Sequence, residues 1–114
     1  MISFEKLQKL ALSFPEATEE PHFEKTSFRV KNKIFATYDA KNNRACIKLS
    51  AVDQDAFSGN RASIYPVDNQ WGKQGWTLIE LETVHLDLFV DAITTAYCEV
   101  APKKLAEQLR IREN

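Results

Sequence analysis

Residues 28–49 have the sequence FRVKNKIFATYDAKNNRACIKL, and they are the most informative part of the chain for its architecture. Apolar and polar residues alternate on either side of two turns, one at Asn32 and one at residues 39–43. The alternation is clearest at the end, where Ala45, Ile47 and Leu49 are interleaved with Arg44, Cys46 and Lys48. A period of two predicts half-buried strands, and short turns between them imply antiparallel pairing. We therefore expect a three-stranded meander with one apolar face and one face that carries Arg29, Lys31, Arg44 and Lys48.

Helical patterns surround this meander. Ser3 is placed to cap a helix whose apolar residues recur every three or four positions until Pro15, and a short helix is expected over 52–57. Residues 16–24 are acidic and contain Pro21, so they are expected to form a loop between helix and sheet. A brief strand is expected at 64–65 and a longer one at 76–81.

The longest helix is expected to be capped by Thr83 and to end before Pro102, where a final short helix begins. Its apolar residues predict a buried stripe made of Leu86, Phe89, Val90, Ile93, Tyr97 and Val100. Taken together, the elements predict an α+β domain in two layers, an antiparallel sheet with helices packed on one face, formed by residues 1–114 as a single unit.

Charge is distributed unevenly along the chain. The 114 residues contain 15 basic and 16 acidic side chains, a net charge of −1, yet residues 25–48 hold seven Lys or Arg against Asp39 alone. A local excess of this kind is compatible with an anionic partner or with an ordinary solvated sheet face whose lysines prevent aggregation, and it does not bear on the fold. The first residues do not resemble a signal peptide and no stretch is apolar enough for a membrane span, so we expect a cytoplasmic protein whose Cys46 and Cys98 are reduced.

A second unusual stretch is Trp71-Gly-Lys-Gln-Gly-Trp76, which places Gly72 and Gly75 between two large aromatic rings. Glycines in this arrangement predict a tight turn in which the backbone approaches its surroundings closely. The tryptophans are expected either to cover the core or to form a platform for a ligand.

Three features together resemble the MmcQ/YjbR-like family: Phe14-Pro-Glu-Ala-Thr-Glu-Glu20, the hairpin of residues 28–36 with Lys33-Ile-Phe-Ala36, and Gly72-Lys-Gln-Gly-Trp76 followed by an amphipathic helix ending near Tyr97. The resemblance extends over nearly the whole chain. It implies a bacterial protein with a fold like that of the frataxin homologue CyaY, with helices on one face of an antiparallel sheet, and it implies DNA binding.

The preferred functional hypothesis is weak, phosphate-directed DNA binding by a monomer. The residues expected to contact DNA are Arg29, Lys31, Lys33, Arg44, Lys48 and Lys73. The alternative is a non-catalytic module that binds a protein or a small ligand through Trp71, Gly72, Gly75 and Trp76.

Catalysis, metal binding and a cofactor are not expected. The chain has no GxSxG, Walker or GxGxxG pattern, and no nucleophile is paired with His85. His22 stands among Glu19, Glu20 and Glu24, and this cluster is interpreted as part of a solvated acidic loop.

Overall fold

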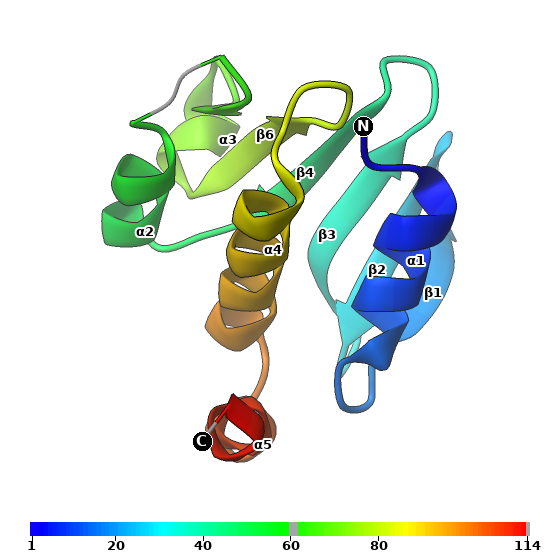
Figure 1. Ribbon diagram of the computed structural model, residues 1–114, viewed down its shortest axis with the longest axis vertical. Coiled ribbons are helices and arrows are strands. Elements are labelled where there is room, and N and C mark those ends of the chain that lie inside the picture. Colours follow the sequence, from blue (N-terminus) through cyan, green and yellow to red (C-terminus); the bar gives the residue numbers. More distant parts are fainter. Residues whose placement is uncertain (60–61, 114) are drawn as a thin grey trace.

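The computed structural model describes residues 1–59 and 62–113, and within them the chain forms an α+β fold of two layers. A six-stranded, entirely antiparallel sheet has the strand order β1-β2-β3-β4-β6-β5, and α1 and α4 pack on one of its faces (Figure 1). The strands are β1 (Thr18–His22), β2 (Lys25–Val30), β3 (Lys33–Asp39), β4 (Arg44–Lys48), β5 (Ile64–Pro66) and β6 (Trp76–Glu80). The helices are α1 (Phe4–Ser13), α2 (Ala51–Phe57), α3 (Gln70–Lys73), α4 (Leu86–Val100) and α5 (Lys103–Glu113). The predicted fold class is confirmed.

Strand β1 corrects one prediction, because residues 16–24 were expected to be a loop. Thr18 to His22 instead pair with β2 along its whole length, from Thr18 opposite Arg29 to His22 opposite Lys25. Strand β1 is an edge strand, and an edge strand tolerates proline because one side of its backbone needs no partner. Pro21 and the glutamates therefore mark a sheet edge, which a sequence pattern does not distinguish from a loop.

The ends of the helices confirm one predicted cap and overturn another. The Ser3 hydroxyl accepts a hydrogen bond from the Lys6 amide, as expected for the start of α1. Helix α4 begins later than predicted, with His85 at its N-cap position, because the Thr83 hydroxyl is engaged with that of Ser63 at 3.0 Å. Leu86 is 41% exposed, so the buried stripe of α4 begins at Phe89.

The core lies between the sheet and the pair α1 and α4. At one end of it Tyr97 stacks on Phe14 at 4.8 Å between ring centroids and meets Phe35 edge-on at 5.4 Å. The Tyr97 hydroxyl donates a hydrogen bond to the Pro15 carbonyl at 2.7 Å. One buried tyrosine thus connects α4, the end of α1 and β3.

The remaining helices leave the other face of the sheet uncovered. Helices α2 and α3 lie beside β5 and β6, and α5 lies at the C-terminal end of α4 (Figure 1). In the part of the chain that the structure describes, no helix is long and apolar enough to cross a membrane.

Candidate nucleic-acid interface

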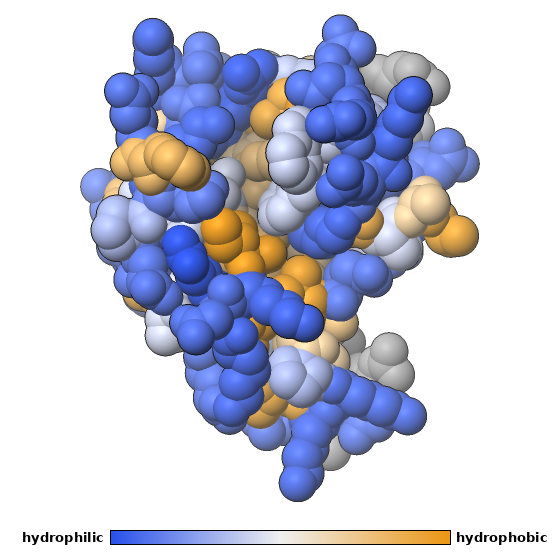
Figure 2. Space-filling view, turned by 180° about the vertical axis from the view of Figure 1, so that it is seen from behind, coloured by the Kyte–Doolittle hydropathy of each residue, from blue (hydrophilic) through white to orange (hydrophobic). Residues whose placement is uncertain are grey.

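The uncovered face of the sheet has a neutral central row of side chains. The strand register places Ser27, Thr37, Cys46, Leu78 and Tyr65 next to one another across β2, β3, β4, β6 and β5. With neighbouring strands about 4.8 Å apart, such a row spans roughly 20 Å. Figure 2 shows this face, with apolar side chains near its centre and hydrophilic ones around them.

On one side of the central row the charges balance. Asp39, Arg44 and Glu80 are successive register partners on β3, β4 and β6, and Lys25 lies close enough to Asp39 to help lower the pKa of that carboxyl, which is lowered mainly by a hydrogen bond from Asn42. Positive and negative groups therefore alternate along this row, which leaves little net charge for a phosphate.

Arg44 is the clearest example of this neutralisation. It donates a hydrogen bond to the Tyr65 hydroxyl at 3.4 Å and lies 4.0 Å from the Glu80 carboxylate, to which Tyr65 also donates. The hydrogen bond to Glu80 raises the pKa of Tyr65, with burial adding to the effect, and the one with Tyr65 raises the pKa of Arg44. The Arg44 Nε is buried without a hydrogen-bond partner among the described residues.

On the other side of the central row the cations are less neutralised. Arg29 forms an ion pair with Glu20 at 4.0 Å, whereas Lys33 and Lys48 make no ion pair with the side chains of residues 1–59 and 62–109. The Lys48 ammonium group donates to the Gln74 carbonyl and lies 5.6 Å from the centre of the Trp76 ring. Excess positive charge is therefore concentrated around Lys33 and Lys48.

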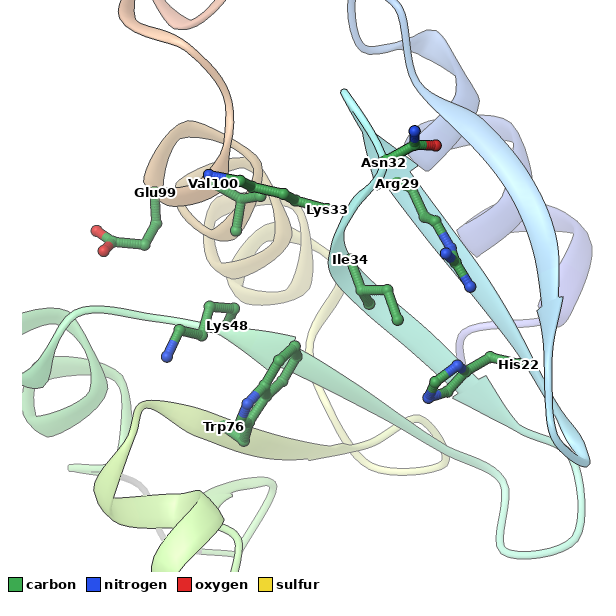
Figure 3. A pocket seen from close by; sticks show the side chains of 9 residues that line it. All are labelled: His22, Arg29, Asn32, Lys33, Ile34, Lys48, Trp76, Glu99 and Val100. Carbon is green, nitrogen blue, oxygen red and sulfur yellow. The ribbon is translucent and has the colours of Figure 1, made fainter.

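Two adjoining hollows run along this face. The first, of about 640 Å³, is shown in Figure 3 and is lined by His22, Arg29, Asn32, Lys33, Ile34, Lys48, Trp76, Glu99 and Val100. The second, of about 490 Å³, is lined by His22, Lys25, Ile34, Thr37, Arg44, Cys46, Val67, Trp71, Trp76 and Leu78. Because His22, Ile34 and Trp76 line both, the two hollows form one groove across the sheet, which we call the sheet groove.

The Trp71–Trp76 stretch forms the wall of this groove at the β6 end. Residues 70–73 form one helical turn, α3, capped by Asn69, and Gly75 has φ +105°, a conformation that favours glycine. A Cβ atom on Gly72 would lie 1.9 Å from the Val67 carbonyl oxygen, and one on Gly75 would lie 2.0 Å from that of Leu49. The expected close approach of the backbone is confirmed, and it makes both glycines structural.

Trp71 and Trp76 differ in exposure. Trp71 is 52% exposed, whereas Trp76 is half-buried within β6. Both rings line the second hollow, so the structure brings the two tryptophans to the same groove as Arg29, Lys33, Arg44 and Lys48.

Two predicted contact residues lie apart from the others. Lys31 is in the turn between β2 and β3 with φ 52°, and its ammonium group forms an ion pair with Glu16 at 2.7 Å. Lys73 is exposed at the end of α3 and lines a separate hollow with Gln54 and Asp68. Neither side chain lines the sheet groove.

Comparison with known proteins identifies the family. The YjbR family model matches residues 12–99, which is most of the chain. The chain belongs to the YjbR family. No curated protein matches it. Among solved structures, the YjbR-family chain is similar to Deinococcus radiodurans protein DR2400, whose structure is described as a DUF419 domain. The two are 21% identical with a TM-score of 0.78, over 96% of this chain and 88% of the other, which supports the shared fold.

Several side chains of the groove in this YjbR-family chain were not among the predicted site residues. Cys46 and Leu78 lie on its floor, and strand alternation alone could have placed both on the uncovered face. His22 was assigned to a loop, and only the pairing of β1 shows that it faces the groove. Ile34 owes its place to a register shift near Phe28 and Arg29, for which the sequence shows no signal.

Among the described residues of the YjbR-family chain, no group of three His, Cys, Asp or Glu side chains is arranged to hold a metal ion. Burial raises the pKa of Cys46 to about 11, so the one thiol in the groove is protonated at neutral pH. A protonated thiol is a poor nucleophile and a poor metal ligand.

Proposed function

We propose that this chain binds nucleic acid, weakly and through phosphate groups, at the sheet groove. The observation that supports it is the composition of the groove wall: Lys25, Arg29, Lys33, Arg44 and Lys48 line it, against Glu99 alone, in a chain of net charge −1. A groove lined by one sign of charge concentrates its potential and attracts ligands of the opposite sign.

The pairing of these cations indicates how strong the binding is. Arg29 and Arg44 already interact with Glu20 and Glu80. The lining cations without an ion pair in the described part of the chain are Lys25, Lys33 and Lys48. Binding that neutralises about three phosphates gives a salt dependence with a slope of about −3 in log K against log salt concentration. A slope of this size is small compared with the slopes of sequence-specific regulators, and it agrees with the weak binding proposed.

The proposal is of a binding module without catalysis and without a cofactor. The raised pKa of Cys46, which makes this thiol a poor nucleophile at neutral pH, is in keeping with it. The cytoplasmic location and the monomeric state expected from the sequence remain predictions.

A second candidate function is binding of a protein or small ligand at the Trp71–Trp76 turn. It is favoured by the 52% exposure of Trp71 beside a hollow of about 490 Å³. In that case Trp71→Ala abolishes binding of the partner, while added salt has little effect because the contact is apolar.

The nucleic-acid proposal is tested by reversing charge at the groove. A fluorescently labelled DNA duplex is titrated with the protein at salt concentrations between roughly 50 and 200 mM, and anisotropy is measured. In the variant Lys33→Glu/Lys48→Glu we expect at least a tenfold loss of affinity at low salt and a slope reduced by about 2. The matched control is Lys6→Glu/Lys9→Glu, which changes the charge equally on exposed positions of α1, the helix on the covered face.

Equal loss of affinity in the two variants would show that only net charge matters. No binding of duplex or single strand by the unmodified protein at 50 mM salt would end the proposal.

A further inference from the structure

The first hollow of the sheet groove lies where β3 and β4 separate. Strand β3 pairs with β4 only from Ala36 to Asp39, so Lys33 and Ile34 extend beyond the paired region. The register shift between Phe28 and Arg29 is a bulge, and bulges bend a strand and increase its twist. The resulting opening lies between Lys33 and Ile34 on one side and Lys48 and Trp76 on the other (Figure 3).

The opening has the size and the chemistry of a ligand pocket. Its volume of about 640 Å³ is within the usual range of roughly 300–1,000 Å³ for small-molecule sites. Ile34, Trp76 and Val100 supply apolar surface, and Arg29, Lys33 and Lys48 supply positive charge around it. A ligand that fits both carries an apolar group close to an anion.

A nucleotide unit has this combination, but its base face is accessible only when it is unpaired. In a duplex the base faces are stacked inside, so a duplex on this surface would leave Ile34 and Trp76 against water or phosphate. In a single strand each base offers a face for stacking on an aromatic ring, and the phosphates follow at regular spacing. Lys48 lies over the Trp76 ring, and Figure 3 shows Trp76 between Lys48 and Ile34.

We propose that the sheet groove binds single-stranded nucleic acid in preference to duplex, with an unpaired base in the opening between β3 and β4 and its phosphates at Lys33, Lys48 and Arg29. The strand continues into the second hollow, where the exposed Trp71 provides the next stacking surface. This inference rests on the proposed function and specifies the form of nucleic acid that the groove selects.

The test compares one labelled mixed-sequence 12-nucleotide strand with the same strand annealed to its complement. Anisotropy at 50 mM salt is expected to show at least tenfold tighter binding of the single strand, and tryptophan fluorescence is expected to be quenched only by it. Trp71→Ala is expected to weaken single-strand binding about fivefold or more and duplex binding less than twofold. Leu12→Ala, which shortens an exposed apolar side chain on α1, is the control and leaves both affinities unchanged.

The outcomes separate this inference from the proposed function. Equal affinity for strand and duplex, both falling with salt, would overturn the single-strand preference and leave nucleic-acid binding standing. If neither the strand nor the duplex binds, both the single-strand preference and the proposed function are overturned. Displacement of the strand by thymidine monophosphate at the same concentration of nucleotide units would show that the groove takes a free nucleotide, and the strand proposal would fail.

Discussion

At the scale of single residues, Phe23 is an unfavourable residue for the turn between β1 and β2. Phe23 has φ 57°, a conformation that costs a non-glycine residue about 1–2 kcal/mol, and its ring is 94% exposed. The turn has two residues between the paired His22 and Lys25, a position where glycine is normally preferred. Neither burial nor backbone preference favours phenylalanine here.

Phe23→Gly is therefore expected to stabilise the fold by about 0.5–1 kcal/mol, because relief of the backbone conformation exceeds the added entropy of the unfolded chain. In thermal unfolding this corresponds to a rise of a few degrees in Tm. Phe23→Ala is the control, since it removes the ring but keeps the Cβ atom, and it is expected to leave Tm within about one degree. A fall in Tm for Phe23→Gly would contradict the argument.

At the scale of secondary-structure elements, Tyr97 holds the two main covering helices to the sheet. Its ring packs on Phe14 and Phe35, and its hydroxyl donates to the Pro15 carbonyl just beyond the end of α1. The ring contacts hold α4 against β3 and the end of α1. The hydrogen bond fixes the position of the chain where it leaves α1 toward β1. The contact lies just before β1, which is itself held by its pairing with β2.

Tyr97→Phe is expected to destabilise the protein by about 1 kcal/mol, because the hydrogen bond is lost while the ring packing is retained. Urea unfolding followed by circular dichroism measures the change, with the slope m unaltered. Tyr38→Phe is the matched control: Tyr38 also packs on a ring, Phe4, but its hydroxyl makes no hydrogen bond in the described part of the chain. A loss of equal size in both variants would rule out a specific role for the Tyr97–Pro15 bond.

At the scale of the whole molecule, the fold raises the pKa of three groups, two on the sheet and one on α4. Burial raises the pKa of Cys46 from its ordinary 9.0 to about 11, and burial is also the main cause that raises the pKa of Tyr97. The hydrogen bond to Glu80 raises the pKa of Tyr65. In each case the folded state binds the proton more tightly than the unfolded state. The stability gained is complete below the unfolded pKa and is lost as pH rises through the folded pKa.

We expect Tm to fall as pH rises from about 9 to 11. Over this interval Cys46 ionises in the unfolded chain before it ionises in the folded protein, which favours unfolding. Cys46→Ala removes one of the three groups, so its loss of Tm between pH 7 and pH 11 is expected to be smaller than that of the unmodified protein. Each variant is compared with its own value at pH 7, which removes the packing effect of the substitution. An identical loss in both would exclude Cys46 as a contributor.

The candidate site could be predicted from the sequence only in part. Arg29, Arg44 and Lys48 follow from strand alternation, and Lys33 from the local excess of basic residues, and all four line the sheet groove. Lys31 belongs to the same excess and Lys73 to the Trp71–Trp76 stretch, but both lie outside the groove, because a turn with positive φ and a short helix direct them away. The sequence did not show that Asp39 and Glu80 lie next to Arg44 on the same face, because strand pairing brings them there.

The sequence by itself determined the α+β architecture, the antiparallel meander, the capped first helix and the glycine-dependent turn between the tryptophans. These features depend on local periodicity, on caps and on backbone conformation, which are encoded within a few residues of each other. Only the tertiary structure decided that residues 18–22 form an edge strand, that β3 separates from β4, and which cations remain unpaired. Those outcomes depend on which strands pair and in what register, so the groove and its excess charge exist only once the sheet has formed.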